Sequence, residues 1–207
     1  MSRGGWWTGV IGVGLALVGV WGTWVPHRAA ALVLSGWDLA EYVKFVPGAS
    51  AIRELFYLPV WCAGIALGVI ANQPANGQQA SRPGRVGLIL IALALMVTLL
   101  PPYPHMLNGF QSGEFRWRFV LGYSGALMVL VSWFSARWPA RIVGALLVAT
   151  ALAGAVLAPW QFLAVRGTIE ALYGSGLGWG LAVFLIGWGL LSVTGGRLLI
   201  THVRGEP

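Results

Sequence analysis

Six long apolar stretches decide what this chain can fold into. They occupy 6–25, 52–71, 86–100, 119–134, 142–162 and 177–199. Each approaches the roughly 20 residues that a helix needs to cross a bilayer core of about 30 Å. Lipid offers backbone groups no hydrogen-bond partners, so such segments fold as helices. The sequence therefore predicts an all-α fold, a polytopic integral membrane bundle of about six transmembrane helices in a single domain, 1–207.

Composition agrees with a membrane protein and argues against several classes of function. Hydrophobic residues make up 57% of the 207 residues and charged residues 9%, against roughly 25% in soluble domains. The basic residues are scattered between apolar runs, so nucleic acid is not an expected partner and membrane lipids are. The sequence contains no GxxxxGK[ST] loop for a nucleotide. Cys62 is the only cysteine, which excludes an internal disulfide and a thiolate metal cluster.

The charges that flank these stretches predict the orientation. One side holds Arg3, Arg82, Arg85, Arg137, Arg141, Arg197 and Arg204, and the other holds Arg28, Lys44, Arg53, Arg116, Arg118 and Arg166. The positive-inside rule places the more basic side, which also holds both termini, in the cytoplasm. Lys44 is the only lysine and Ala and Gly are abundant, a bias that favours a bacterial plasma (inner) membrane.

The longest outer loop is expected to contain a short amphipathic helix at about 36–46, in the membrane interface or across the end of the bundle. Ser35 and Asp38 have the spacing of a capping box, in which both side chains bind free N–H groups of the first turn. Helical geometry places Leu39 and Val43 on the apolar face. The candidates for docking a partner are Trp37, Asp38, Glu41 and Tyr42 of this helix, with Arg116 and Arg118 of another outer loop.

Gly122-Tyr123-Ser124-Gly125, at the start of the fourth stretch, is the most specific short motif. It resembles the GxSG nucleophile motif of rhomboid intramembrane proteases, which have six core helices with that serine on the fourth. The resemblance implies a histidine on the sixth helix, because an unassisted hydroxyl is a poor nucleophile. The stretch 177–199 contains no histidine, and His202 falls on the opposite membrane side. We therefore expect no catalytic residue here, and interpret Gly122 and Gly125 as packing positions.

His27 and His105 are the candidates for binding a cofactor. Each follows a proline on the outer side, and two imidazoles can supply the axial ligands of a haem. Both follow helix ends rather than lie within helices, so interfacial histidines bonded to water or headgroups are the simpler interpretation. The outer acidic residues lack the spacing of a metal loop and have outer-side cations as ion-pair partners. No metal site and no cofactor is therefore predicted, with haem as an alternative.

Glycines around the start of the sixth stretch predict close helix packing. Gly174 and Gly178, and likewise Gly176 and Gly180, form small-xxx-small pairs. Polar residues inside the apolar stretches are few, which disfavours a proton- or ion-coupled carrier. The expected function is a small non-catalytic subunit that packs in or stabilises a larger complex, with other integral membrane subunits as partners. The alternatives are a transporter or channel-like component for a lipid or small apolar solute, and a haem-binding redox subunit.

Overall fold

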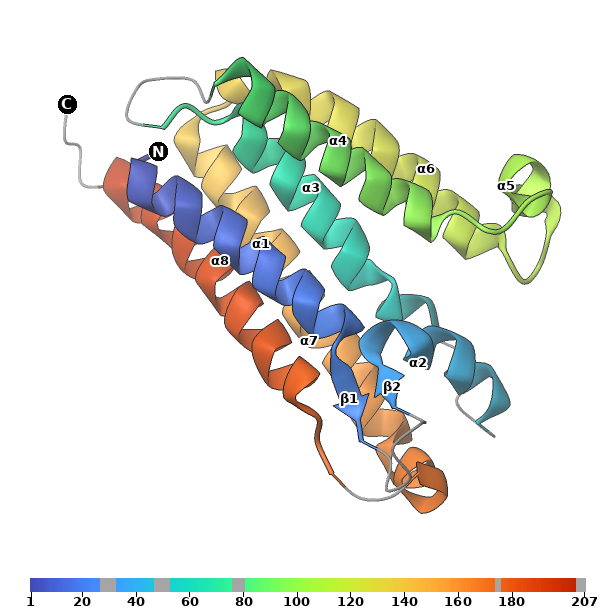
Figure 1. Ribbon diagram of the computed structural model, residues 1–207. Coiled ribbons are helices and arrows are strands. Elements are labelled where there is room, and N and C mark those ends of the chain that lie inside the picture. Colours follow the sequence, from blue (N-terminus) through green and yellow to red (C-terminus); the bar gives the residue numbers. More distant parts are fainter. Residues whose placement is uncertain (27–32, 47–52, 76–80, 174–175, 204–207) are drawn as a thin grey trace.

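The structure, a computed structural model, describes residues 1–26, 33–46, 53–75, 81–173 and 176–203. Within these residues the chain forms a bundle of helices with a two-stranded hairpin at one end (Figure 1). The long helices are α1 (Arg3–Trp21), α3 (Leu58–Asn72), α4 (Arg82–Leu99), α6 (Arg116–Val131), α7 (Ala140–Tyr173) and α8 (Trp179–Val203). The short elements are β1 (Thr23–Val25), β2 (Leu34–Ser35), α2 (Gly36–Tyr42), α5 (His105–Asn108) and the 3-10 turns η1 (Val43–Phe45), η2 (Arg53–Phe56), η3 (Gly109–Gln111) and η4 (Ser132–Arg137). The fold is therefore almost entirely helical, as predicted.

Five of the described helices are long and apolar enough to cross a membrane: α1, α4, α6 with η4, α7 and α8. These helices fit a multi-pass membrane protein. The second apolar stretch differs from the prediction, because it divides at Tyr57 into η2 and the 15-residue helix α3. Pro59 lies in the first turn of α3, where a residue without a backbone N–H is tolerated and favours a new helix start. At 15 residues, α3 is about 22 Å long, so six spans remain a prediction.

Helix α3 lies at the centre of the bundle. Each of its residues except Leu58 and Trp61 is buried. Helices α4 and α6 pack against it on one side, α1 and α7 pack on the other, and α8 packs against α1 and α7 (Figure 1). Near its C-terminal end the Ile70 carbonyl accepts a hydrogen bond from Trp6 Nε1 at 3.0 Å. A helix surrounded in this way has no polar face, as its sequence shows.

Two other stretches end at different residues than predicted. Helix α1 ends at Trp21, and 23–25 form a strand that pairs with β2 instead of a last helical turn. Helix α7 runs for 34 residues to Tyr173, well past residue 162. Arg166 and Glu170 lie one turn apart on it and form an ion pair, with Nε and Oε1 2.5 Å apart. Ion pairs at this spacing stabilise a helix, which helps α7 continue past the apolar stretch.

Helices α1 and α8 run antiparallel and approach each other closely. A Cβ added to Gly187 of α8 would meet the backbone of Gly12 and Ala16 on α1. The backbones come this close because neither glycine has a side chain. Of the four predicted packing glycines, Gly178 and Gly180 lie against the backbone of residues 22–23, Gly176 has a φ of 151° beside Pro26, and Gly174 is outside the described residues.

Replacing Gly187 with Ala is expected to loosen the contact between α1 and α8, because the added methyl group meets backbone atoms that cannot move aside. We expect the free energy of unfolding to fall by about 1–3 kcal/mol, as for other overpacked sites. Gly189→Ala is the matched control on the same helix, since a Cβ there meets nothing within 4 Å. Thermal unfolding in detergent measures both variants. Equal stability of the two variants would contradict this account of the interface.

Candidate functional site

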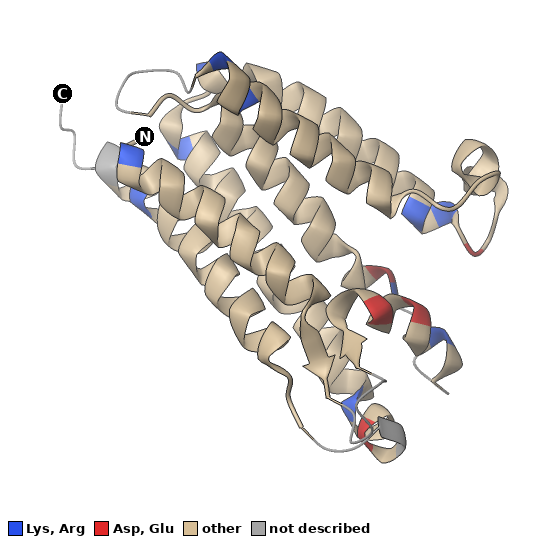
Figure 2. Cartoon of the chain, viewed as in Figure 1, with Lys and Arg blue, Asp and Glu red and all other residues tan. Residues whose placement is uncertain are grey.

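The described acidic residues gather at one end of the bundle. Figure 2 shows Asp and Glu at the end that carries the hairpin, whereas Lys and Arg occur at both ends. The start of α1 and the end of α8 lie together at the opposite end (Figure 1). We call the acidic end the outer end, following the predicted orientation.

Helix α2 closes the outer end. The Ser35 Oγ accepts a hydrogen bond from the Asp38 backbone N–H, and Asp38 Oδ2 accepts one from the Ser35 N–H, both at 3.1 Å. This confirms the predicted capping box. Leu39 and Val43 are fully buried, so the apolar face of the helix covers the end of the bundle. Its polar face presents Glu41 toward α3 and α6.

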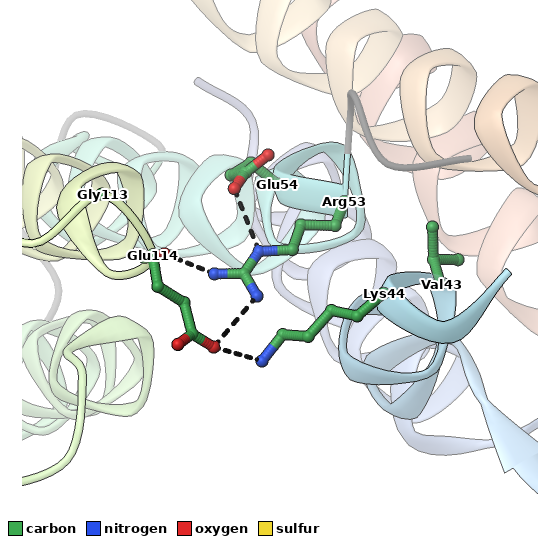
Figure 3. A pocket seen from close by; sticks show the side chains of 6 residues that line it. All are labelled: Val43, Lys44, Arg53, Glu54, Gly113 and Glu114. Atoms are coloured by element: carbon green, nitrogen blue, oxygen red, sulfur yellow. Dashed lines mark hydrogen bonds and ion pairs between the residues drawn. The ribbon is translucent and has the colours of Figure 1, made fainter. Parts of the chain in front are cut away.

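Two cations bind Glu114, which lies just before α6 (Figure 3). Lys44 Nζ donates to Glu114 Oε1 at 2.7 Å, and Arg53 Nη1 lies 3.6 Å from the same oxygen. Arg53 also donates to the Glu114 carbonyl and, at 3.1 Å, to Glu54 Oε1. With Val43 and Gly113, these residues line a pocket of about 260 Å³. They connect η1 and η2 to the loop between α4 and α6.

Arg118, on the first turn of α6, continues this network to the end of α4. Its guanidinium donates to the carbonyls of Leu99 and Leu100, each at 3.2 Å. Carbonyls at a helix C-terminus lack intrahelical partners, and a cation stabilises them. The same group lies 3.4 Å from Glu41 Oε1 and 4.9 Å from the Tyr57 ring. Tyr57 donates its hydroxyl proton to Glu41 at 2.5 Å.

We call Glu41, Lys44, Arg53, Glu54, Glu114 and Arg118 the outer charge network. A hydrogen bond from Lys44 lowers the pKa of Glu114. Burial raises the pKa of Glu41, but hydrogen bonds from Lys44 and Tyr57 outweigh it and the net shift is downward. Burial lowers the pKa of Lys44, and its two glutamate partners reverse that shift. Each shift moves away from neutrality, whereas an acid–base catalyst needs a pKa near the working pH. Glu41, Lys44 and Glu114 therefore stay charged near neutral pH, and their ion pairs hold the outer segments together.

The structure brings some of the predicted docking candidates together. Glu41 and Arg118 meet in the outer charge network. Asp38 serves the helix cap, and Arg116 lies 4.9 Å from the ring of Phe110. Trp37 is half-buried, with ring centroids 5.0 Å from Tyr57 and 6.1 Å from Trp21. Tyr42 is also half-buried. The aromatic members therefore pack within the chain.

The residues of the GxSG motif serve helix packing. Ser124 Oγ accepts a hydrogen bond from Trp61 Nε1 at 3.3 Å and lies 3.4 Å from the Leu121 carbonyl. Gly125 lies against Trp61 and Met96, and Gly122 against Leu100. His202 lies in the last turn of α8, at the opposite end from the network.

His105 begins α5, and its ring stacks on Phe115 with centroids 4.8 Å apart. His27 is outside the described residues. In the part of the chain that the structure describes, no three His, Cys, Asp or Glu residues are grouped to hold a metal ion.

A second concave site opens on the side of the bundle. Helices α6 and α7 both pack against α3 rather than against each other. They leave a groove of about 250 Å³, which we call the side groove, lined by Trp61, Cys62, Ile65, Met128, Leu146, Ala149, Thr150 and Ala153. The Thr150 hydroxyl is bonded within α7, at 2.9 Å to the Leu146 carbonyl. The groove therefore presents an apolar lining.

Comparison of the chain with protein-family models, curated proteins and solved structures gives no match.

The outer charge network predicts a stability that depends on pH at both extremes. Glu41 and Glu114 have folded pKa values below the ordinary 4.5, so their contribution is present above that value and is lost as the pH falls through the folded values. Lys44 has a folded pKa above 10.5, so its contribution is full below 10.5 and is lost as the pH rises through the folded value. The unfolding temperature in detergent should therefore be level between about pH 5 and 10 and fall outside that range.

Glu114→Gln tests which group is responsible for the acid side. It should lower stability at neutral pH by less than about 1 kcal/mol, because Glu114 is half exposed, and flatten the fall below pH 4.5. An acid limb identical to that of the unchanged protein would contradict the assignment.

Arg118→Lys is expected to destabilise the outer end, because lysine cannot reach two carbonyls, a carboxylate and an aromatic ring at once. The loss should be about 1–3 kcal/mol, the usual contribution of hydrogen bonds to a charged group. Arg116→Lys is the control two residues away, where the side chain is exposed, and should change little. Unfolding in detergent compares the two variants. A larger loss of stability at Arg116 would contradict the role of Arg118 in binding the C-terminal carbonyls of α4.

Proposed function

We propose that this chain is a small non-catalytic subunit of a larger complex in the bacterial plasma membrane. In this proposal its six long helices span the bilayer with both termini in the cytoplasm. The described residues at the end with the termini include Arg3, Arg82, Arg141 and Arg197, and Figure 2 draws no acidic residue there among those described. That distribution supports the orientation under the positive-inside rule.

The observation that carries the proposal is an apolar segment that projects from the outer end. This projecting segment comprises residues 103–111, which include α5 and η3. Figure 1 shows α5 standing away from α1, α7 and α8. In this segment Tyr103 is 76% exposed, Leu107 70% and Phe110 55%. Aromatic residues are enriched in protein interfaces, where they bury a large apolar area. The projecting segment therefore offers a surface for a second membrane chain.

The outer charge network supports this interpretation because it holds the segment in place. Glu114 comes three residues after η3 and is bound by Lys44 of η1 and Arg53 of η2. Arg118 binds the end of α4, where the segment begins. A surface held in its bound arrangement loses less conformational freedom on association. In this proposal the network positions the docking surface. Its charged side chains act by holding the projecting segment and do not bind the partner themselves.

A transporter or channel-like component for a lipid or small apolar solute is the second candidate, favoured by the side groove. Such a path needs no buried charge. The haem-binding subunit remains the third candidate. It rests on His27 and His105, and the absorption spectrum of the purified protein tests it through the presence or absence of a Soret band.

The docking proposal predicts that replacing Tyr103 and Leu107 with Ser weakens association with partner chains, because it removes exposed apolar area from the projecting segment. The measurement is purification of tagged protein from its native membrane in mild detergent, with mass spectrometry of the co-purifying chains. We expect stoichiometric partners with the unchanged protein and a clear loss with the double variant, at unchanged levels in the membrane fraction.

The matched control replaces Trp160 and Leu163 of α7, which are 56% and 59% exposed, with Ser. It should retain the partners. The proposal is overturned if the unchanged protein purifies alone, or if the variant at Tyr103 and Leu107 keeps its partners.

A further inference from the structure

We propose that the side groove binds one acyl chain of a membrane phospholipid. Its floor is formed by Trp61, Cys62 and Ile65 of α3, and its walls come from α6 and α7. All three helices are apolar, and α7 and the run formed by α6 with η4 are long enough to span a membrane. The groove opens sideways between two helices that do not pack on each other. In a bilayer, an opening of this kind faces lipid.

The size of the groove suits a single lipid chain. A helix of about 10 Å diameter occupies roughly 400 Å³ for each turn. The groove holds about 250 Å³, less than one such turn, so a whole helix does not enter it and a partner helix reaches it only with side chains. A single alkyl chain is no wider than an aliphatic side chain and enters the groove along its length.

The lining suits an alkyl chain along its length. Ala149 and Ala153 lie one turn apart on α7 and form a wall of small side chains, and Met128 of α6 lines the groove as well. Methionine is flexible and adapts to irregular apolar shapes. The polar groups at the groove are already paired, since Trp61 Nε1 donates to Ser124 and the Thr150 hydroxyl to Leu146. A polar solute therefore has little to bind.

The position along α3 favours an amphiphile over a purely apolar solute. The groove begins at Trp61, one turn along the chain from Tyr57, which hydrogen-bonds Glu41 of the outer charge network. A lipid with its chain in the groove therefore has its headgroup at the level of that network. Apolar lining below a charged layer is the arrangement of a phospholipid itself. This inference rests on the proposed membrane location, but it does not depend on a partner subunit.

The test is native mass spectrometry of the protein purified in mild detergent, which measures retained lipid. Ala149→Phe with Ala153→Phe fills the groove. The matched control is Ala94→Phe with Ala164→Phe, two exposed alanines of α4 and α7 outside the groove. We expect the unchanged protein and the control to retain about one phospholipid for each chain, and the filled variant to lose most of it. Equal retention by the two variants, or none by the unchanged protein, overturns the proposal.

A second measurement covers the case in which the filled variant does not fold. The unchanged protein is reconstituted in nanodiscs with a phospholipid that carries a photoactivatable diazirine in its acyl chain. Crosslinks concentrated in 61–65 and 146–153 support the proposal, and crosslinks spread evenly over the exposed face of α4 overturn it. A retained mass equal to a free fatty acid overturns the assignment to phospholipid. Co-purifying chains are counted in the same samples, so an unchanged protein that retains its partners but no phospholipid refutes this inference alone.

Discussion

Burial of one short helix organises the molecule. Helix α3 is buried on nearly every side, so the other long helices have to arrange themselves around it. Two groups result, with α4 and α6 on one side and α1, α7 and α8 on the other. Because both groups attach to the same central helix, they need not touch each other along their full length. The side groove is the gap that this arrangement leaves between α6 and α7.

The outer charge network supplies hydrogen-bond partners for the loop backbone at the outer end. At this end the segment between α1 and α3 meets the segment between α4 and α6, and loops carry polar backbone groups that need partners. Arg118 binds the last carbonyls of α4, and Arg53 binds the carbonyl of Glu114. The same cations neutralise Glu41, Glu54 and Glu114. The ion pairs therefore join the two groups while they satisfy the loop backbone. This is consistent with a structural role for the network in the proposed subunit.

Close backbone contact plays the corresponding role between α1 and α8. Gly12 and Gly187 face each other, and Gly19 lies against Phe184. In lipid, helices gain little from hydrophobic burial against each other, so packing at short range has to hold them. Small residues make that packing possible. The start of α1 and the end of α8 are thereby brought to the same end of the bundle (Figure 1).

Local features were predictable from the sequence because neighbouring residues decide them. The capping box depends only on Ser35 and Asp38, which are three residues apart, and the apolar face of α2 depends only on apolar residues that recur three or four positions apart. The apolar stretches were found for the same reason, although their ends were not. Residues 23–25 became a strand because they pair with residues 34–35, a contact that the hydropathy pattern does not contain. The presence of outer-side ion pairs could be expected from composition, but the choice of partners could not.

By itself the sequence determined an almost entirely helical chain, apolar helices of membrane-spanning length, a capped helix before the second apolar stretch, and acids that except for Glu206 all lie in the segments predicted to be outer. Tertiary structure decided that Lys44 binds Glu114, 70 residues away, that α3 is central, and that α6 and α7 enclose a groove. The physical reason is that helix formation depends on neighbouring residues, through the length of an apolar run and the spacing of apolar side chains within it. Ion pairs and grooves depend on which helices pack together, and apolar surfaces of similar composition leave that choice to the shape of their side chains.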